Sequence, residues 1–285
     1  STAIIDNIDA DMPVGESRVP LEAYSLDDPE RLSDEELDAM IVALLVLANH
    51  DPSVLVKNVD TDVTVGQAAE LRDGTGTPGE VLGVDSYIIQ QLISEQVITV
   101  IGVDNIPDDS YADVEKTRLI KSEVISMITA IEILGNYDDD LEVSMIDADD
   151  VTVGQAKELN QLNSPITKKL ISSSIIDAID PDDEGKIPLE AFEGDPADRL
   201  LTDDERNAMI VALEILAEHD LTTLVREIST IVTVGQVQEF KEGTGDPLEV
   251  RAIHAYTIKQ LISDEVEGVI TTIPDDAYNN PMTRD

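Results

Sequence analysis

The chain has 285 residues, enough for about two ordinary domains or a short array of repeats, and its 42% hydrophobic content favours a packed core. Sixty-one acidic residues against 18 basic ones give a formal net charge of −43, which disfavours nucleic acid and anionic membrane surfaces as partners. The absence of cysteine excludes disulfides, thiolate metal sites and cysteine nucleophiles.

The first predicted helix lies near Asp34–Asn49, where apolar side chains recur three and four positions apart. Ser33 precedes it and Glu36 follows three residues later, which is the capping-box pattern of a helix start. Thr202 and Glu205 repeat this pattern later in the chain. In a capping box the glutamate side chain reaches back to the N-cap amide, so we expect Glu36 and Glu205 to point toward their own helix starts.

Further helices are predicted at regular intervals along the chain. A threonine followed three residues later by a glutamine predicts capped helix starts at Thr64 and Gln67, Thr152 and Gln155, and Thr233 and Gln236. Apolar stretches predict a short helix near Val54–Val59 and longer helices near Ser86–Ile101, Pro165–Ile179 and Tyr256–Ile270. These elements predict an all-α protein.

A repeated string sets the predicted organisation. Val-Thr-Val-Gly-Gln occurs at residues 63–67, 151–155 and 232–236, at spacings of 88 and 81. A Gly-Thr-Gly loop occurs at Gly74–Gly76 and Gly243–Gly245 but has no counterpart in the middle copy. We therefore predict tandem repeats of about 81–88 residues, roughly four helices each, alternating A-B-A in an elongated array. The predicted division is 1–30 (the end of a B unit and a joint), 31–117 (A), 118–198 (B) and 199–285 (A).

Proline-aromatic strings are predicted to join the units. An aliphatic residue, proline and an aromatic four residues later occur at Val19–Tyr24, Ile106–Tyr111, Ile187–Phe192 and Ile273–Tyr278. Proline stiffens each connection, and we expect the aromatic side chain to enter the core of the next unit. The chain starts and stops out of phase with this period, as expected of a window on a longer array or of a subunit that continues into its neighbour.

One acidic loop has the composition of a calcium site. Asp180-Pro-Asp-Asp-Glu-Gly-Lys-Ile187 resembles the first eight positions of an EF-hand loop, with oxygen ligands expected from Asp180, Asp182 and Glu184. The bidentate glutamate of that loop is replaced by Ala191. Asp9 and Asp11 form a matching stretch near the start of the chain. The alternative is a plain acidic turn without a cation.

Catalytic patterns are not found in the sequence. His50 and His219 are predicted at the ends of equivalent helices, where the helix dipole favours a histidine. The Gly-Thr-Gly loops do not have the Lys-Ser/Thr ending of a phosphate-binding loop, and no Gly-x-Ser-x-Gly or His-Glu-x-x-His string is present. The sequence therefore predicts a protein that is not an enzyme.

The predicted function is structural. We expect head-to-tail self-assembly into an extracellular or cell-surface filament, sheath or surface layer, with Ca²⁺ as the candidate cation between copies, without nucleic acid and without a membrane span. The acidity fits either a salt-rich source or an outside surface rich in divalent ions. The alternative is a stalk or binding module of a surface adhesin, which engages a protein or glycan through the Gly-Thr-Gly loops.

Overall fold

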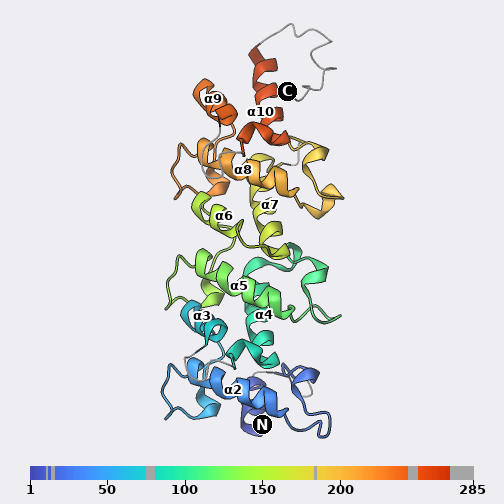
Figure 1. Cartoon of the computed structure of the whole chain (residues 1–285), viewed down its shortest axis with the longest axis vertical. Helices are drawn as coiled ribbons and strands as arrows, with labels where there is room; N and C mark the ends of the chain where they lie inside the picture. The colour runs from blue at the N-terminus through green and yellow to red at the C-terminus, as the bar shows by residue number, and fades with distance from the viewer. Residues whose placement is uncertain (11, 14–16, 75–80, 183–184, 243–249, 270–285) are drawn as a thin grey trace. The chain divides into compact units, whose positions relative to one another are not determined.

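The fold is all-α in the part of the chain that the computed structural model describes, which is residues 1–285 without 11, 14–16, 75–80, 183–184, 243–249 and 270–285 (Figure 1). Backbone pairing in these residues is limited to isolated bridges, so the predicted fold class is confirmed at this level. Among the described helices, none combines the length and the apolar character that crossing a bilayer requires.

The α-helices with a predicted range or start lie close to it, no range is predicted for α1 and α5, and the short helix predicted near Val54–Val59 is the 3₁₀ helix η2. They are α1 (Thr2–Ile8), α2 (Asp34–Leu47), α3 (Val65–Asp73), α4 (Tyr87–Ile101), α5 (Lys121–Leu134), α6 (Val153–Leu159), α7 (Pro165–Ile179), α8 (Asp203–Leu216), α9 (Val234–Glu242) and α10 (Tyr256–Val269). Short 3₁₀ helices connect them: η1 (Leu21–Ala23), η2 (Val56–Asn58), η3 (Gly83–Asp85), η4 (Val103–Asn105), η5 (Asp108–Ser110), η6 (Val143–Met145), η7 (Leu189–Ala191), η8 (Pro196–Asp198), η9 (Val225–Glu227) and η10 (Ala252–His254).

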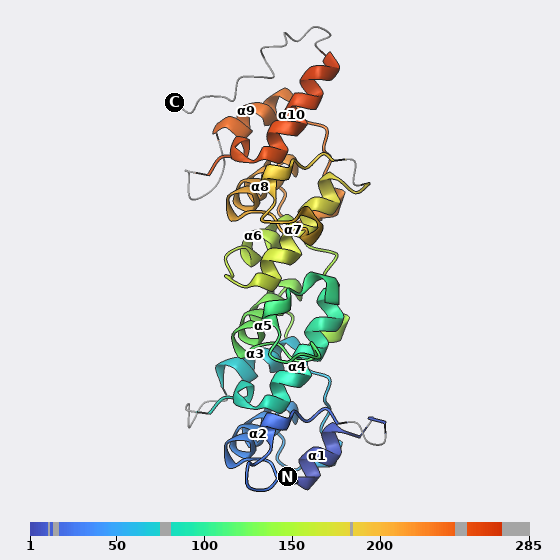
Figure 2. The ribbon, with the colours of Figure 1, turned by 90° about the vertical axis from the view of Figure 1, so that its right-hand side faces the viewer.

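Contacts divide the chain into two compact units, which are residues 1–149 with 158–170, and residues 150–157 with 171–285. In the first unit α3 packs against α2 and α5, and α4 packs against α2, α5 and η6 (Figures 1 and 2). In the second unit α8 packs against α9, α10 and η10. Both cores are built from aliphatic side chains, with Phe240 as the largest fully buried residue.

The predicted capping boxes of the three Thr-Val-Gly-Gln strings form. The Thr64 N–H donates to Gln67 Oε1 (3.0 Å), and the Gln67 N–H donates to Thr64 Oγ1 (3.2 Å). The same pair of bonds forms at Thr152 and at Thr233. Each pair satisfies amides that a helix start would otherwise leave free, which fixes where α3, α6 and α9 begin.

The prediction that Glu36 and Glu205 complete capping boxes is wrong, because neither glutamate side chain accepts from its own N-cap amide. Ser33 does accept from the Glu36 N–H (3.1 Å), but the Ser33 N–H donates to the Ala23 carbonyl (2.9 Å) and not to the glutamate. The Thr202 N–H likewise donates to the Ala191 carbonyl. Because a distant carbonyl already binds the N-cap amide, each glutamate is left to cap a different helix.

That other helix is the last one of the same predicted unit. Glu36 is buried and accepts from Ser86 Oγ (2.5 Å) and from the N–H groups of Tyr87 (2.9 Å) and Ile88 (3.1 Å), at the start of α4. Glu205 accepts in the same way from the residues that begin α10. A buried carboxylate at a helix start satisfies free amides and complements the positive end of the helix dipole.

In the predicted joints the aromatic residue pairs with a later leucine through the backbone. Tyr24, Tyr111 and Phe192 each form an isolated bridge with a leucine eight or nine positions later, which is Leu32, Leu119 and Leu201 respectively. These leucines are completely buried, whereas among the aromatics Tyr111 is buried and Tyr24 and Phe192 stay partly exposed. The side chain that fills the core is therefore the leucine more than the aromatic ring. The fourth string, at residues 273–278, lies outside the described residues.

Candidate functional site

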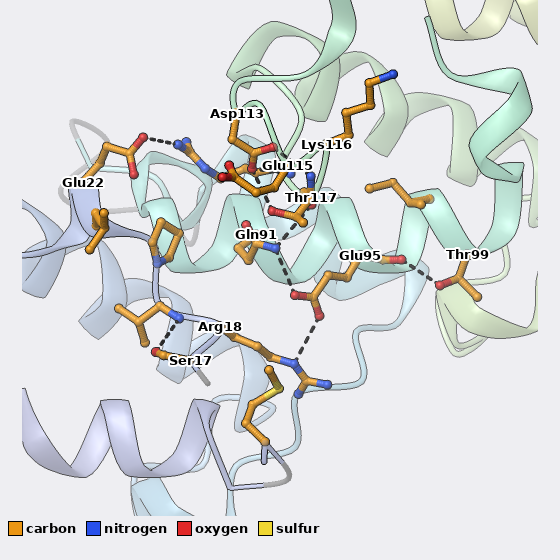
Figure 3. Close-up of a pocket in the computed structure, with 16 residues that line it drawn as sticks. Ser17, Arg18, Glu22, Gln91, Glu95, Thr99, Asp113, Glu115, Lys116 and Thr117 are labelled. Atoms are coloured by element: carbon orange, nitrogen blue, oxygen red, sulfur yellow. Dashed lines mark hydrogen bonds and ion pairs between the residues drawn. The ribbon is translucent and has the colours of Figure 1, made fainter. Parts of the chain in front are cut away.

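The best-formed pocket lies in the first unit, between the segment at residues 17–22, α4 and the loop at residues 113–118 (Figure 3). It has a volume of about 740 Å³ and a charged lining. Glu95 of α4 accepts from Gln91 Nε2 (3.0 Å) and lies 3.3 Å from Arg18 Nε. Asp113 accepts from the Thr117 N–H and hydroxyl, both at 2.8 Å. Glu95 thus holds the segment to α4, and Asp113 fixes the shape of the loop.

Arg118 is the most enclosed charge of this pocket. Its guanidinium is buried, donates to Glu22 Oε1 at 2.6 Å and lies over the Tyr87 ring at 5.2 Å from the centroid. A charge-assisted hydrogen bond and a cation–π contact together offset part of the desolvation cost of the arginine. The arrangement is that of a structural joint, because its charges neutralise one another inside the pocket.

A second recurring feature is a contact between a helix start and a distant loop, which we call the helix-start junction. In the first unit the N–H groups of Val65 and Gly66 donate to the carbonyls of Leu141 (2.9 Å) and Asp139 (3.1 Å). The Val143 N–H returns a bond to the Val63 carbonyl (2.9 Å). The first turn of α3 thus finds its acceptors in the loop that follows α5.

The second unit contains the same junction. Val153 and Gly154 at the start of α6 donate to the carbonyls of Thr223 and Leu221, both at 2.9 Å, in the loop that follows α8. The Val225 N–H donates to the Val151 carbonyl (2.8 Å). The two junctions use the same three bonds in the same register.

Basic side chains reinforce both junctions. Arg72 of α3 pairs with Glu132 of α5 and donates to Thr129 Oγ1 (2.8 Å). In the second unit Lys157 of α6 lies 3.0 Å from Glu214 of α8. The hydrogen bonds that Arg72 donates to Asp73, together with the pairing with Glu132, raise the pKa of Arg72 despite partial burial. Each junction thus contains one of the 18 basic residues of the chain, paired with a glutamate of the neighbouring helix.

The predicted calcium ligands are only partly described. Asp180 is buried, and its Oδ2 accepts from the N–H groups of Gly185 and Lys186, both at 2.9 Å. Asp9 is used in the same way by Ser17 Oγ (2.7 Å) and the Arg18 N–H (2.8 Å). Asp182 is exposed. Glu184 and Asp11 lie outside the described residues, and within the described ones no group of three metal-ligating side chains is found. Calcium binding stays a prediction.

The two helix-end histidines make structural contacts. His50 follows α2 as the second of two residues with positive φ, and its Nε2 lies 2.9 Å from Glu70 Oε2 of α3. His219 and Glu239 repeat this contact at 2.9 Å. In the middle of the chain a tyrosine takes the place of the histidine, and the Tyr137 hydroxyl donates to Glu158 (2.6 Å). That hydrogen bond raises the pKa of Tyr137. The contact therefore persists when the imidazole is replaced.

The Gly-Thr-Gly loops fall almost wholly outside the described residues. Gly74 ends α3 with φ of 90°, a conformation that favours glycine, and residues 75–80 and 243–249 follow outside the described part. The loops of the predicted binding module therefore belong to the part of the chain outside the described residues.

Sequence reasoning missed the buried glutamates. Glu123 is the third of them: it accepts from Ser164 Oγ (2.7 Å), next to the start of α7. The signal was available, because Glu36, Glu123 and Glu205 occupy the same position relative to the helices that contain them. A local capping box explained two of the three so well that a second use was not considered.

Comparisons of the chain with known protein families, with curated proteins and with solved structures find no match.

Proposed function

We propose that this chain is a non-catalytic structural protein, built from tandem helical repeats in A-B-A order, which assembles head to tail. The observation that carries the proposal is the helix-start junction, because the third helix of one predicted repeat is completed by the loop of the next. Repeats of this kind have nearest-neighbour interfaces and need a continuation or a cap at each end.

Other recurring contacts support the repeat organisation. The glutamate caps, the threonine capping boxes and the buried joint leucines occur once in each predicted repeat, at matching positions. The pocket fits the same interpretation, because Arg18 in the segment 1–30 pairs with Glu95 in the predicted repeat 31–117, and Glu22 of that segment accepts from Arg118, where the following repeat begins. We place the assembly outside the cell or on its surface, where salt or divalent cations screen a net charge of −43.

Electron microscopy with sedimentation velocity tests this function. The full chain is studied over a range of protein concentrations, in low salt, in high salt, and in Ca²⁺ followed by a chelator. Regular assemblies that grow with protein concentration are the expected result, and their dispersal by the chelator would add support for calcium. A chain that stays monomeric in every condition would contradict the proposal.

A further inference from the structure

The start of α9 carries the sequence of a helix-start junction, but no loop covers it within the described part of the chain. Val65 and Val153 are 0% exposed in their junctions, whereas Val234 is 89% exposed. Among the described residues no group accepts from the N–H groups of Val234 or Gly235. Two free amides and an exposed valine thus lie where the other two copies of the string bind a loop.

The glycine of this string has a function only when the loop is present. A Cβ atom at Gly66 would lie 2.8 Å from the Asp139 Cβ and 3.0 Å from its carbonyl oxygen, and one at Gly154 would lie 3.1 Å from the Leu221 carbonyl oxygen. At Gly235 the nearest atom is Thr233 Oγ1 at 3.9 Å. Nothing within the described chain requires glycine at position 235, although glycine disfavours a helix.

The complementary surface is exposed on α2 and on the loop that follows it. Ile41 of α2 is 63% exposed, whereas its counterparts Ile128 of α5 and Ile210 of α8 are 0% and 6% exposed. The helix α3 packs against α5, and α6 forms an ion pair with α8. No described helix occupies the equivalent position on α2. Val54 and Leu55, in the loop after α2, are exposed as well. The described part of the chain therefore presents both halves of a helix-start junction, and neither half has a partner within that part.

We propose that a second copy of this chain joins these two surfaces, so that α9 of one copy lies on α2 and the following loop of the next; this rests on the proposed function. In the register of the two internal junctions, Val234 and Gly235 of one copy donate to the carbonyls of Val54 and Pro52 of the second copy. The second copy's Val56 N–H donates to the Val232 carbonyl. The proline is compatible with this role, because only its carbonyl is used.

The junction between copies differs from the internal ones in charge. Leu45 of α2 stands where Glu132 and Glu214 accept a basic side chain, and Leu45 is itself exposed. The new contact is therefore more apolar, and Lys241 of α9 covers it with the hydrocarbon part of its side chain. Since both copies are strongly acidic, salt favours the contact by screening their repulsion.

Two single-end variants test the proposal by sedimentation velocity in about 1 M NaCl, where the Debye length is about 3 Å. Gly235→Ala blocks the α9 surface, and Ile41→Glu blocks the α2 surface. Val114→Glu is the control, because it places the same charge at a residue that is even more exposed (93%) and belongs to neither surface. Thermal unfolding of each variant checks that the monomer is folded.

We expect Gly235→Ala to weaken association about ten- to hundredfold while its monomer is at least as stable as wild type. Ile41→Glu weakens association similarly, and Val114→Glu associates like wild type. Mixing the two blocked variants gives dimers only, because one intact α9 surface then meets one intact α2 surface.

Two outcomes overturn the proposal in different ways. If both blocked variants assemble like wild type, the chain still self-associates but through other surfaces, so the proposed function survives and the interface does not. If wild type stays monomeric at every salt and protein concentration, both fail, and the α9 surface has an occupant other than a second copy.

Discussion

A single carboxylate decides how two helices of a predicted repeat are held together. Glu36 lies on α2, and its oxygens bind the hydroxyl and amides that begin α4, about 50 residues later in the chain. Removing one partner of a buried, charge-assisted hydrogen bond leaves the other groups unsatisfied. The contribution of this residue to stability is therefore far larger than its place on an acidic helix start suggests.

Replacement of this residue is predicted to be strongly destabilising. We expect Glu36→Ala to lower the free energy of unfolding by about 3 kcal/mol, because it uncaps α4 within the core. Chemical denaturation measures the change. The control is Glu35→Ala on the exposed side of the same turn, for which we expect a change within about 0.5 kcal/mol. Equal effects of the two substitutions would contradict the assignment of Glu36 as a cap.

Glu123 predicts a pH dependence of stability. Burial raises the pKa of Glu123, although hydrogen bonds from Ser164 and from the Ile166 amide oppose the shift. The folded state therefore holds the proton more tightly than the unfolded state does, so this group favours folding increasingly as the pH falls from neutrality through its raised pKa.

The variant Glu123→Gln isolates this effect, since glutamine does not titrate. We expect the difference in unfolding free energy, wild type minus variant, to shift in favour of wild type between pH 7 and about pH 5. Glu30→Gln removes the same charge at an exposed position and serves as the control. A difference that is constant with pH, or that shifts the other way, would contradict the prediction.

At the scale of helices, the sequence predicts where a helix starts but not which distant residues its side chains contact. Thr64 and Gln67 specify the beginning of α3 locally, because both bonds of the capping box join residues three positions apart. The burial of Glu36 depends on Ala23, whose carbonyl binds the Ser33 amide, and no local pattern contains that information. The paired left-handed residues at Asn49 and His50 were equally hidden, because neither is glycine.

The site follows the same rule. Three copies of Thr-Val-Gly-Gln were visible in the sequence, and their threonine and glutamine were explained correctly as a helix start. The glycine was not explained, because its reason is the close approach of Asp139 and Leu221, which only a three-dimensional structure contains. A recurring glycine near a helix start, where alanine would be preferred, was the signal.

The glycines of α3 and α9 are predicted to respond in opposite ways to the same substitution. Gly66→Ala should destabilise the protein by about 1–3 kcal/mol, since the added methyl group clashes with the backbone and side chain of Asp139. Gly235→Ala should stabilise the monomer by up to about 1 kcal/mol, because a better helix former enters open space. Thermal unfolding at a concentration where the chain is monomeric compares the two. Effects of the same sign would show that the start of α9 is covered.

At the scale of the whole molecule, charge dominates. A net charge of −43 opposes any compact state, because the carboxylates repel one another more strongly when the chain is folded than when it is extended. We expect the midpoint of thermal unfolding to rise steadily from about 0.1 M to about 1 M NaCl, as the Debye length falls from about 10 Å to about 3 Å. A flat or falling midpoint would contradict this account.

The same titration tests the calcium prediction. The midpoint of thermal unfolding is measured in CaCl₂ and in NaCl at equal ionic strength. Charge screening is then the same in both salts, and any difference in the midpoint reports specific calcium binding. If the predicted loop binds the ion, we expect calcium to raise the midpoint of thermal unfolding more than sodium does. The difference should be lost in Asp180→Asn but kept in Asp195→Asn, which changes an exposed loop residue. Equal rises with the two salts would argue for a plain acidic turn.

The uncovered start of α9 also makes the protein its own reference for amide hydrogen exchange. Amides at Val65, Gly66, Val153 and Gly154 are hydrogen-bonded in their junctions, whereas those of Val234 and Gly235 have no acceptor among the described residues. In dispersed protein the third pair should exchange at the rate of an open peptide while the first two pairs exchange slowly. Once copies join, the third pair should slow to match the others. The exchange rates of two backbone amides would then report what fraction of the α9 surfaces is occupied.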